Sequence, residues 1–221
     1  MLAFELISEV VPVIHPNDTA AEALGWMDVF RVSHLPVVDN KTYFGLISDS
    51  DIFDLNKPES RISEYPHPLS RPYVKDQQHI YEVIDAVSKY KITVVPVLNQ
   101  QEEYLGLITV NDLAQKFSLL MSAENPGGII VLEIKSMDYS LSEISQIVEG
   151  NDAKILSLYV RTYQMIDQYE ITLKLNRTDL SAVIQTFERY NYQIKAIYAN
   201  SSEVDSLMKD RLDSFFKYLN V

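Results

Sequence analysis

The chain has 221 residues, a formal net charge of −12 and no cysteine. An apolar share of 47% with 23% charged residues is typical of a folded soluble protein, and the length allows one to three modules. The lack of cysteine excludes disulfides, thiolate metal sites and cysteine nucleophiles, and the acidic balance disfavours non-specific nucleic-acid binding, which depends on neutralising phosphates.

The amino terminus has no basic segment followed by a long apolar run, so we expect no signal peptide. No stretch approaches the roughly 18 consecutive apolar residues that membrane insertion requires. With the absence of cysteine, these features favour a cytoplasmic location. The motifs Gly-x-Ser-x-Gly, Gly-x-x-x-x-Gly-Lys and His-Glu-x-x-His are absent, so we expect the protein not to be an enzyme.

The first half of the chain contains an internal duplication. An offset of 60 aligns Pro12-Val13-Ile14 with Pro72-Tyr73-Val74, and Pro36-Val37 with Pro96-Val97. One extra residue near Gln100 makes the offset 61, and GLISDSDIF at 45–53 then coincides with GLITVNDLA at 106–114. The spacing Gly-x-x-Ser/Thr-x-x-Asp is kept while the residues between change, which indicates that the glycine, the hydroxyl and the carboxylate are constrained.

Each copy predicts the same elements in the same order. An extended segment ends at Ile14 or Val74, and an amphipathic helix follows with apolar residues at helical spacing. A buried strand (LPVVD or VPVLN), a second strand (YFGLIS or EYLGLIT) and a closing helix near Asp51 or Asp112 complete the copy. The proline-rich stretch 56–72 is predicted to link the two copies. The helical stripes are Ala20, Ala23, Leu24 and Met27 in the first copy and Ile80, Val83, Ile84 and Val87 in the second.

The pattern changes at Asn125-Pro126-Gly127-Gly128. The remainder reads β-α-β-β-α-β, which is the ferredoxin-like order, and an apolar stripe from Val204 to Leu219 predicts a final helix. We therefore expect an α/β and α+β protein whose parts are residues 1–58, 59–124 (linker and second copy), 125–200 and the carboxy-terminal helix 201–221.

The duplicated phrase, preceded by an apolar-Pro-Val strand, resembles a tandem pair of CBS domains, the unit called a Bateman module. The part after Asn125 looks like an ACT domain, and the order CBS-CBS-ACT is similar to bacterial acetoin-utilisation regulatory proteins. The resemblance implies two CBS domains facing each other across a pseudo-twofold axis, with two clefts that can take an adenine nucleotide or a related adenosyl ligand. It also implies a regulatory role and a homodimer, with no further cofactor.

Candidate ligand-binding residues follow from the resemblance. Ser48 and Asp51 would serve one cleft, and Thr109 and Asp112 the other, because a carboxylate can accept from both hydroxyls of a ribose. The family's adenine-facing strand positions are occupied here by Val13, Ile14, Tyr73, Val74, Leu35 and Val95. Phosphate contacts are expected among Arg31, His34, Arg71, Lys75 and Lys91.

Each assignment has an alternative. Asp51 and Asp112 could serve only as helix caps, and His34 could be a structural histidine before a buried strand. The carboxylates of Asp49, Asp51 and Asp54 lack the glycine and bidentate glutamate of a calcium loop, so we expect no metal site. The whole chain could instead be a ligand-free module that recruits a partner enzyme or transporter.

The ACT-like part has its own alternatives. Ligand-binding ACT domains have an Asp-x-x-Gly-like loop after the first strand. Here Asp138 is present, but no glycine follows it in Ser136-Met137-Asp138-Tyr139-Ser140. The sequence therefore favours a dimerising role for this part, with amino-acid sensing as the alternative.

Overall fold

The computed structural model describes residues 1–163 and 167–199. The chain forms two compact units, Met1–Lys116 and Phe117–Val221. No helix in the described ranges is long and apolar enough to cross a bilayer. Each unit is considered by itself below.

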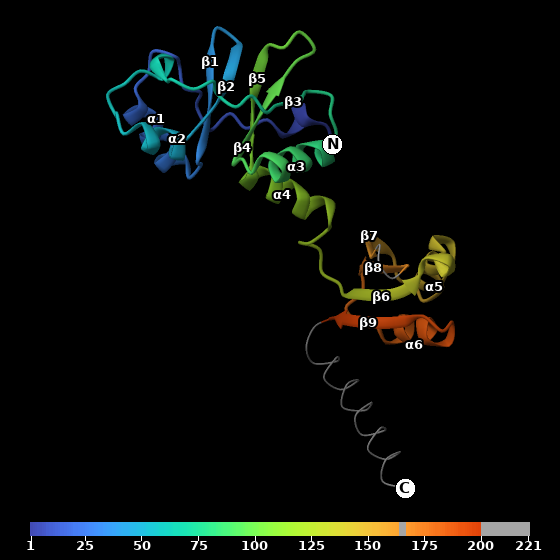
Figure 1. Ribbon diagram of the computed structural model, residues 1–221. Helices are drawn as coiled ribbons and strands as arrows, with labels where there is room; N and C mark the ends of the chain where they lie inside the picture. The colour runs from blue at the N-terminus through green and yellow to red at the C-terminus, as the bar shows by residue number, and fades with distance from the viewer. Residues whose placement is uncertain (164–166, 200–221) are drawn as a thin grey trace, which may run out of the picture. The chain divides into compact units, whose positions relative to one another are not determined.

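The first unit contains both copies of the repeat. In each copy a helix precedes a strand hairpin and a second helix follows it, so α1 and α2 lie beside the first hairpin and α3 and α4 beside the second (Figure 1). The first copy comprises α1 (Ala20–Phe30), β1 (His34–Asp39), β2 (Thr42–Ser48) and α2 (Asp49–Leu55). The second comprises β3 (Val74–Lys75), α3 (Ile80–Tyr90), β4 (Val94–Leu98), β5 (Tyr104–Thr109) and α4 (Val110–Leu120).

Local chemistry explains where the first helix of each copy begins and ends. Thr19 and Glu22 form a capping box at the start of α1, and His79 and Glu82 form the equivalent box at the start of α3. Both helices end in a left-handed residue, Arg31 or Lys91. The predicted helical stripes face the core. Ala20, Ala23 and Met27 are buried in α1, and Ile80 and Val83 in α3. The other predicted stripe residues, Leu24, Ile84 and Val87, are partly buried against the same core.

The two hairpins share one register. β1 pairs with β2 antiparallel and β4 with β5 antiparallel, each with an irregularity opposite the glycine of the repeated phrase. Val74 pairs parallel with Val97, and Ile14 makes the equivalent bridge to Val37. Apolar residues from both copies then form one continuous core. The copies are therefore halves of a single folded unit.

The segment that leads into each copy packs on the other copy. The short 3-10 turn η1 (Ala3–Leu6) is hydrogen-bonded to the second copy, and η2 (Ile62–Glu64) is hydrogen-bonded to the first. Ser8 bridges to Leu107, and Ser70 bridges to Leu46, the equivalent position in the first copy. We call residues 1–8 and 60–70 the crossing segments. Because each crossing segment packs on the other copy, the two copies share one hydrophobic core.

The glycines of the repeated phrase sit beneath these crossing segments. Gly45 and Gly106 have φ of 152° and 158°, a region that favours glycine. A Cβ on Gly45 would lie 2.6 Å from Leu69 Cβ, and one on Gly106 would overlap Ile7 Cγ2. The chain's own crossing segments thus approach each glycine closely, which explains why the repeated phrase keeps a glycine at this position.

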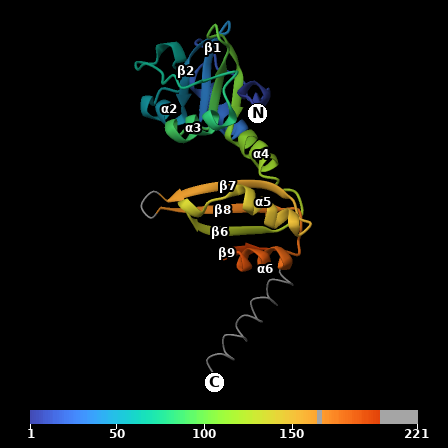
Figure 2. The same cartoon turned by 90° about the vertical axis from the view of Figure 1, so that its right-hand side faces the viewer.

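The second unit has the ferredoxin-like order that the sequence predicts. Its strands lie side by side in the order β7-β8-β6-β9, all antiparallel, with α5 and α6 together on one face (Figure 2). A hydrophobic core lies between the helices and the sheet, and the fully buried Phe187 is one of its largest side chains. The elements are β6 (Ile129–Lys135), the 3-10 turn η3 (Ser136–Asp138), α5 (Leu141–Gly150), β7 (Ile155–Tyr163), β8 (Gln168–Leu175), α6 (Ser181–Arg189) and β9 (Gln193–Tyr198). The predicted helix 201–221 lies outside the described residues.

Candidate functional site

The two copies meet through polar side chains at the start of β1 and just before β4. Ser33 N donates to Thr93 Oγ1 at 2.9 Å, and His34 Nδ1 lies 3.1 Å from the same oxygen. Thr93 N donates to His34 Nδ1 at 3.4 Å. Ser33 and Thr93 are equivalent residues of the duplication, so this contact marks the pseudo-twofold relation between the copies.

The second helix of each copy begins beside this contact. Asp49 N, the first residue of α2, donates to Ser33 O, and Val110 N, the first residue of α4, donates to Thr93 O, both at 3.1 Å. The predicted ribose-binding carboxylates lie in the first turn of each helix. Asp51 and Asp112 therefore flank the contact between the copies at equivalent positions.

Asp51 is held by its own helix terminus. Its Oδ2 accepts from Ser48 Oγ at 2.6 Å and from Ser48 N at 3.0 Å. Ser48 Oγ in turn accepts from Asp51 N at 3.1 Å, which completes a capping box. Capping, the alternative reading of this residue, is thus one of its roles.

Asp112 is held less completely. Its Oδ2 accepts from Thr109 Oγ1 at 2.6 Å, and Thr109 Oγ1 accepts from Asp112 N at 3.0 Å. Within the described part of the chain, its Oδ1 accepts no hydrogen bond, and the Ser48 hydrogen bonds to Asp51 likewise fall on Oδ2 alone. Thr109 is buried and Asp112 is partly exposed. The second copy therefore offers a carboxylate that is positioned through one oxygen and can accept from a ligand with the other.

His34 is a half-buried member of the contact. Burial lowers the pKa of its imidazole, and the nearby carboxylates of Asp49 and Asp51 oppose this only in part. Thr93 N donates to Nδ1, so this nitrogen accepts in the neutral ring and cannot do so once protonated. The structural role considered for His34 is present, and its Nδ1 is engaged in it.

This histidine predicts a pH-dependent stability. Because the folded state lowers the His34 pKa below its ordinary value of 6.5, the unfolded state binds more protons at acidic pH. Its contribution to the free energy of unfolding should be complete above that value and decline as the pH falls below it. Urea unfolding at about pH 7.5 and about pH 5.5 checks this. His34→Asn, which keeps an acceptor, should show a smaller decline; an equal decline would contradict the assignment.

The basic candidates divide into two groups. Arg31 and Lys91 end the helices that lead to the contact, two residues before Ser33 and Thr93; Arg31 is exposed and pairs with Asp28 at 2.9 Å. Two others lie at the far end of the strands: Arg71 Nε donates to Tyr43 O, and Lys75 Nζ donates to Asn99 O. Only the first group, with His34, lies close in the chain to the contact.

The predicted adenine-facing residues do not line this region with their side chains. Four of them are fully buried in the shared core: Ile14, Leu35, Val74 and Val95. Val13 and Tyr73 are half-buried in a separate cluster with Val38, Leu98, Tyr43 and Tyr104, at the opposite end of β1 and β4 from His34. Their role at an adenine ring therefore stays a prediction.

Sequence reasoning missed Tyr65, which lies in the proline-rich linker. Its hydroxyl donates to Asp51 O at 3.3 Å and also interacts with the Asp51 side chain. Its ring forms part of the wall of a cavity of about 590 Å³ between the linker and the first hairpin. That cavity contains no lysine or arginine and has Asp39 as its carboxylate, so it suits a phosphate poorly. Its lining is Pro16, Val37, Asp39, Phe44, Ile62, Ser63, Tyr65, His67, Pro68 and Leu69.

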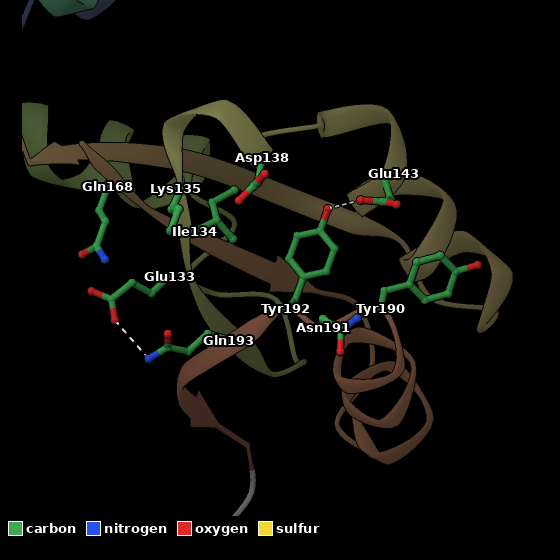
Figure 3. Close-up of a pocket in the computed structure, with 10 residues that line it drawn as sticks. All are labelled: Glu133, Ile134, Lys135, Asp138, Glu143, Gln168, Tyr190, Asn191, Tyr192 and Gln193. Carbon is green, nitrogen blue, oxygen red and sulfur yellow. Dashed lines mark hydrogen bonds between the residues drawn. The ribbon is translucent and has the colours of Figure 1, made fainter. Parts of the chain in front are cut away.

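The second unit has a cavity of about 440 Å³ at the end of β6, beside the 3-10 turn that carries Asp138 (Figure 3). Tyr192, the residue before β9, donates to Glu143 Oε2 at 2.6 Å. Burial and this carboxylate raise the pKa of Tyr192. Three carboxylates and one lysine make the lining acidic. The full lining is Glu133, Ile134, Lys135, Asp138, Glu143, Gln168, Tyr190, Asn191, Tyr192 and Gln193.

No group of three or more histidine, aspartate or glutamate side chains in residues 1–163 and 167–199 is arranged to hold a metal ion. The acidic residues 49, 51 and 54 of α2 are thus not arranged as a metal site.

Comparison with known proteins follows the duplication. A family model described as CBS domain matches residues 3–57 and 62–118. Inosine-5'-monophosphate dehydrogenase from Methanocaldococcus jannaschii is 20% identical over 67% of this chain and 30% of its own length. Arabinose 5-phosphate isomerase KdsD from Francisella tularensis is 26% identical over 47% of this chain and 33% of its own length. The chain spans about a third of the length of these two curated relatives or less.

Solved structures resemble about half of the chain. A putative acetoin utilization protein (AcuB) from Vibrio cholerae is 22% identical with a TM-score of 0.49, over 56% of this chain and 95% of its own. A CBS domain pair/ACT domain protein from Thermotoga maritima is 17% identical with a TM-score of 0.47, over 53% of this chain and 96% of its own. CBSX2 in complex with AMP is 18% identical with a TM-score of 0.47, over 53% of this chain and 96% of its own.

Proposed function

This chain belongs to the CBS domain family, and we propose that it is a regulatory protein whose CBS pair binds an adenine nucleotide beside the contact between the two copies. The observation that carries the proposal is the equivalent placement of Asp51 and Asp112. Each lies in the first turn of a helix that starts next to Ser33 or Thr93. The nucleotide acts as a ligand, and no catalysis is proposed.

The chemistry of each position suits a nucleotide. A carboxylate fixed through one oxygen can accept from a ribose hydroxyl with the other, and a hydrogen bond to a charged group contributes roughly 1.5–3 kcal/mol. The amino terminus of α4 favours a phosphate. Lys91 and Arg31 supply positive charge nearby, in a chain that is otherwise acidic. Regulation follows if the nucleotide prefers one of two arrangements of the copies.

A thermal-shift panel tests the proposal. The full chain is heated with AMP, ADP, ATP, NAD or S-adenosylmethionine, and at least one should raise the melting temperature. A ligand at 100 times its Kd adds about 2.7 kcal/mol to the free energy of unfolding. The double variant Asp51→Ala/Asp112→Ala should lose that gain. If none of the five ligands stabilises the chain at millimolar concentration, the alternative of a ligand-free module that recruits a protein partner is favoured instead.

The cavity in the second unit supports a second candidate function, amino-acid sensing. Asp138, the residue expected in an ACT ligand loop, lines that cavity although no glycine follows it. The acidic lining favours lysine or arginine over glutamate or aspartate. Adding these four amino acids to the panel tests this function, and a uniform absence of stabilisation would leave dimerisation as the proposed role of the unit.

A further inference from the structure

The two crossing segments are equivalent but unequal in length. Ser63 N donates to Pro16 O, and Leu46 N donates to Ser70 O. On the second copy, Phe4 N donates to Asp76 O, and Ser8 N donates to Leu107 O. The two equivalent hydrogen bonds are seven residues apart in the linker segment (63 to 70) and four residues apart in the amino-terminal segment (4 to 8). The linker therefore carries three extra residues, which fall in the stretch 64–69.

The same hydrogen bonds show that Tyr65 and Leu6 occupy equivalent positions in the two segments. Both residues lie at the end of a short 3-10 turn, two positions after Ser63 or Phe4. Leu6 is buried in the shared core and has no polar side-chain atom. Tyr65 instead reaches α2, where its hydroxyl donates to Asp51 O at 3.3 Å. The two equivalent carboxylates thus differ in what the neighbouring crossing segment brings to them.

Electrostatics agree with this placement. Burial raises the pKa of the Tyr65 hydroxyl, and so do the nearby carboxylates of Asp51 and Asp54. The hydroxyl therefore stays protonated and donates toward the carboxyl-bearing turn of α2. Asp51 is also the better satisfied carboxylate, because Ser48 N donates to it in addition to the serine hydroxyl.

We propose that Tyr65 closes the first of the two nucleotide positions, so that the CBS pair takes one adenine nucleotide, at Asp112. This inference rests on the proposed function. A ribose diol at Asp51 would have to displace the Tyr65 side chain, which interacts with that carboxylate. The equivalent residue of the other crossing segment is Leu6, which has no polar side-chain atom and is buried in the core. Tyr65 is then a specificity-determining residue that makes the two halves of a duplicated pair unequal.

Isothermal titration calorimetry tests the inference by counting sites. The full chain is titrated with the adenine nucleotide that gives the largest thermal shift, and we expect one nucleotide per chain. Tyr65→Leu, which installs the residue found at the equivalent position of the other segment, should bind two. Combining Asp51→Ala with Tyr65→Leu should return the count to one.

The outcomes separate the two claims. The role of Tyr65 is overturned if the unaltered chain binds two nucleotides. It is also overturned if the unaltered chain and the Tyr65→Leu variant each bind one. In either case the proposed function still stands. Binding by neither protein would overturn the proposed function and this inference with it. Circular dichroism and thermal melting of Tyr65→Leu establish that it is folded. Tyr65→Phe, which keeps the ring, is a second variant for the count and should still bind one.

Discussion

Replacing Asp112 by alanine should lower the affinity for the stabilising adenine nucleotide roughly 5- to 150-fold, which corresponds to about 1–3 kcal/mol of lost charge-assisted hydrogen bonding. The carboxylate is positioned through Oδ2 by Thr109 and offers Oδ1 to the ligand. Calorimetric titration of the full chain with that nucleotide measures the change.

The variant also loses part of a helix cap, and this effect needs a matched control. Asp51→Ala removes the equivalent cap from α2, where Asp51 has one more hydrogen bond. Each substitution should lower the free energy of unfolding by about 0.5–2 kcal/mol. Both variants are therefore melted without ligand before titration. An unchanged nucleotide affinity in Asp112→Ala would rule out the ribose role of this carboxylate.

Gly45→Ala should lower the free energy of unfolding by about 1–3 kcal/mol, the range for an overpacked site. The new Cβ would lie 2.6 Å from Leu69 Cβ and 2.7 Å from Ser70 O, and a backbone oxygen cannot swing away as a side-chain end can. The φ of 152° adds strain for any residue with a Cβ. Urea denaturation of the full chain measures the loss.

Gly25 provides the control for this substitution. It lies inside α1, and a Cβ there would meet no atom within 4 Å. Gly25→Ala should therefore raise stability by up to about 1 kcal/mol, because alanine is the better helix former. If both variants shift stability in the same direction by similar amounts, close packing of the linker on Gly45 is not what constrains that glycine.

Most of the secondary structure could be predicted from hydrophobic periodicity and from the internal duplication. The stripe from Ala20 to Met27 and the alternating strands on either side of Asp39 follow from local patterns, and the second copy repeats them. The β-α-β-β-α-β order of the second unit follows in the same way and is confirmed. The assignment of that unit as an ACT domain stays a prediction, as do the domain boundaries.

Local patterns could not reveal the crossing segments. Whether residues 1–8 pack on their own copy or on the other depends on contacts far apart in the chain, such as Ser8 with Leu107. For the same reason the sequence could show only that the glycine of the repeated phrase is constrained. What approaches it, Ile7 or Leu69, is a property of the folded pair.

The carboxylates of the candidate site could be predicted from the sequence, but the residues that surround them could not. Ser48, Asp51, Thr109 and Asp112 were found because the duplication preserves their spacing. Tyr65 was missed because it has no counterpart of its type in the other copy, so comparing the copies could not single it out. Leu35 and its equivalent were placed at a ligand by the family resemblance, yet their side chains are fully buried in the core.

The exchange of arms between the copies has a consequence for the origin of the chain. A solitary copy would expose the edge of its second strand at Leu46 or Leu107, since the arm that covers this edge belongs to its twin. An ancestor with a single copy could protect that edge as a domain-swapped homodimer, in which each subunit covers the strand of the other with its amino-terminal segment. Gene fusion would then have joined two already entwined subunits and freed each half to diverge separately.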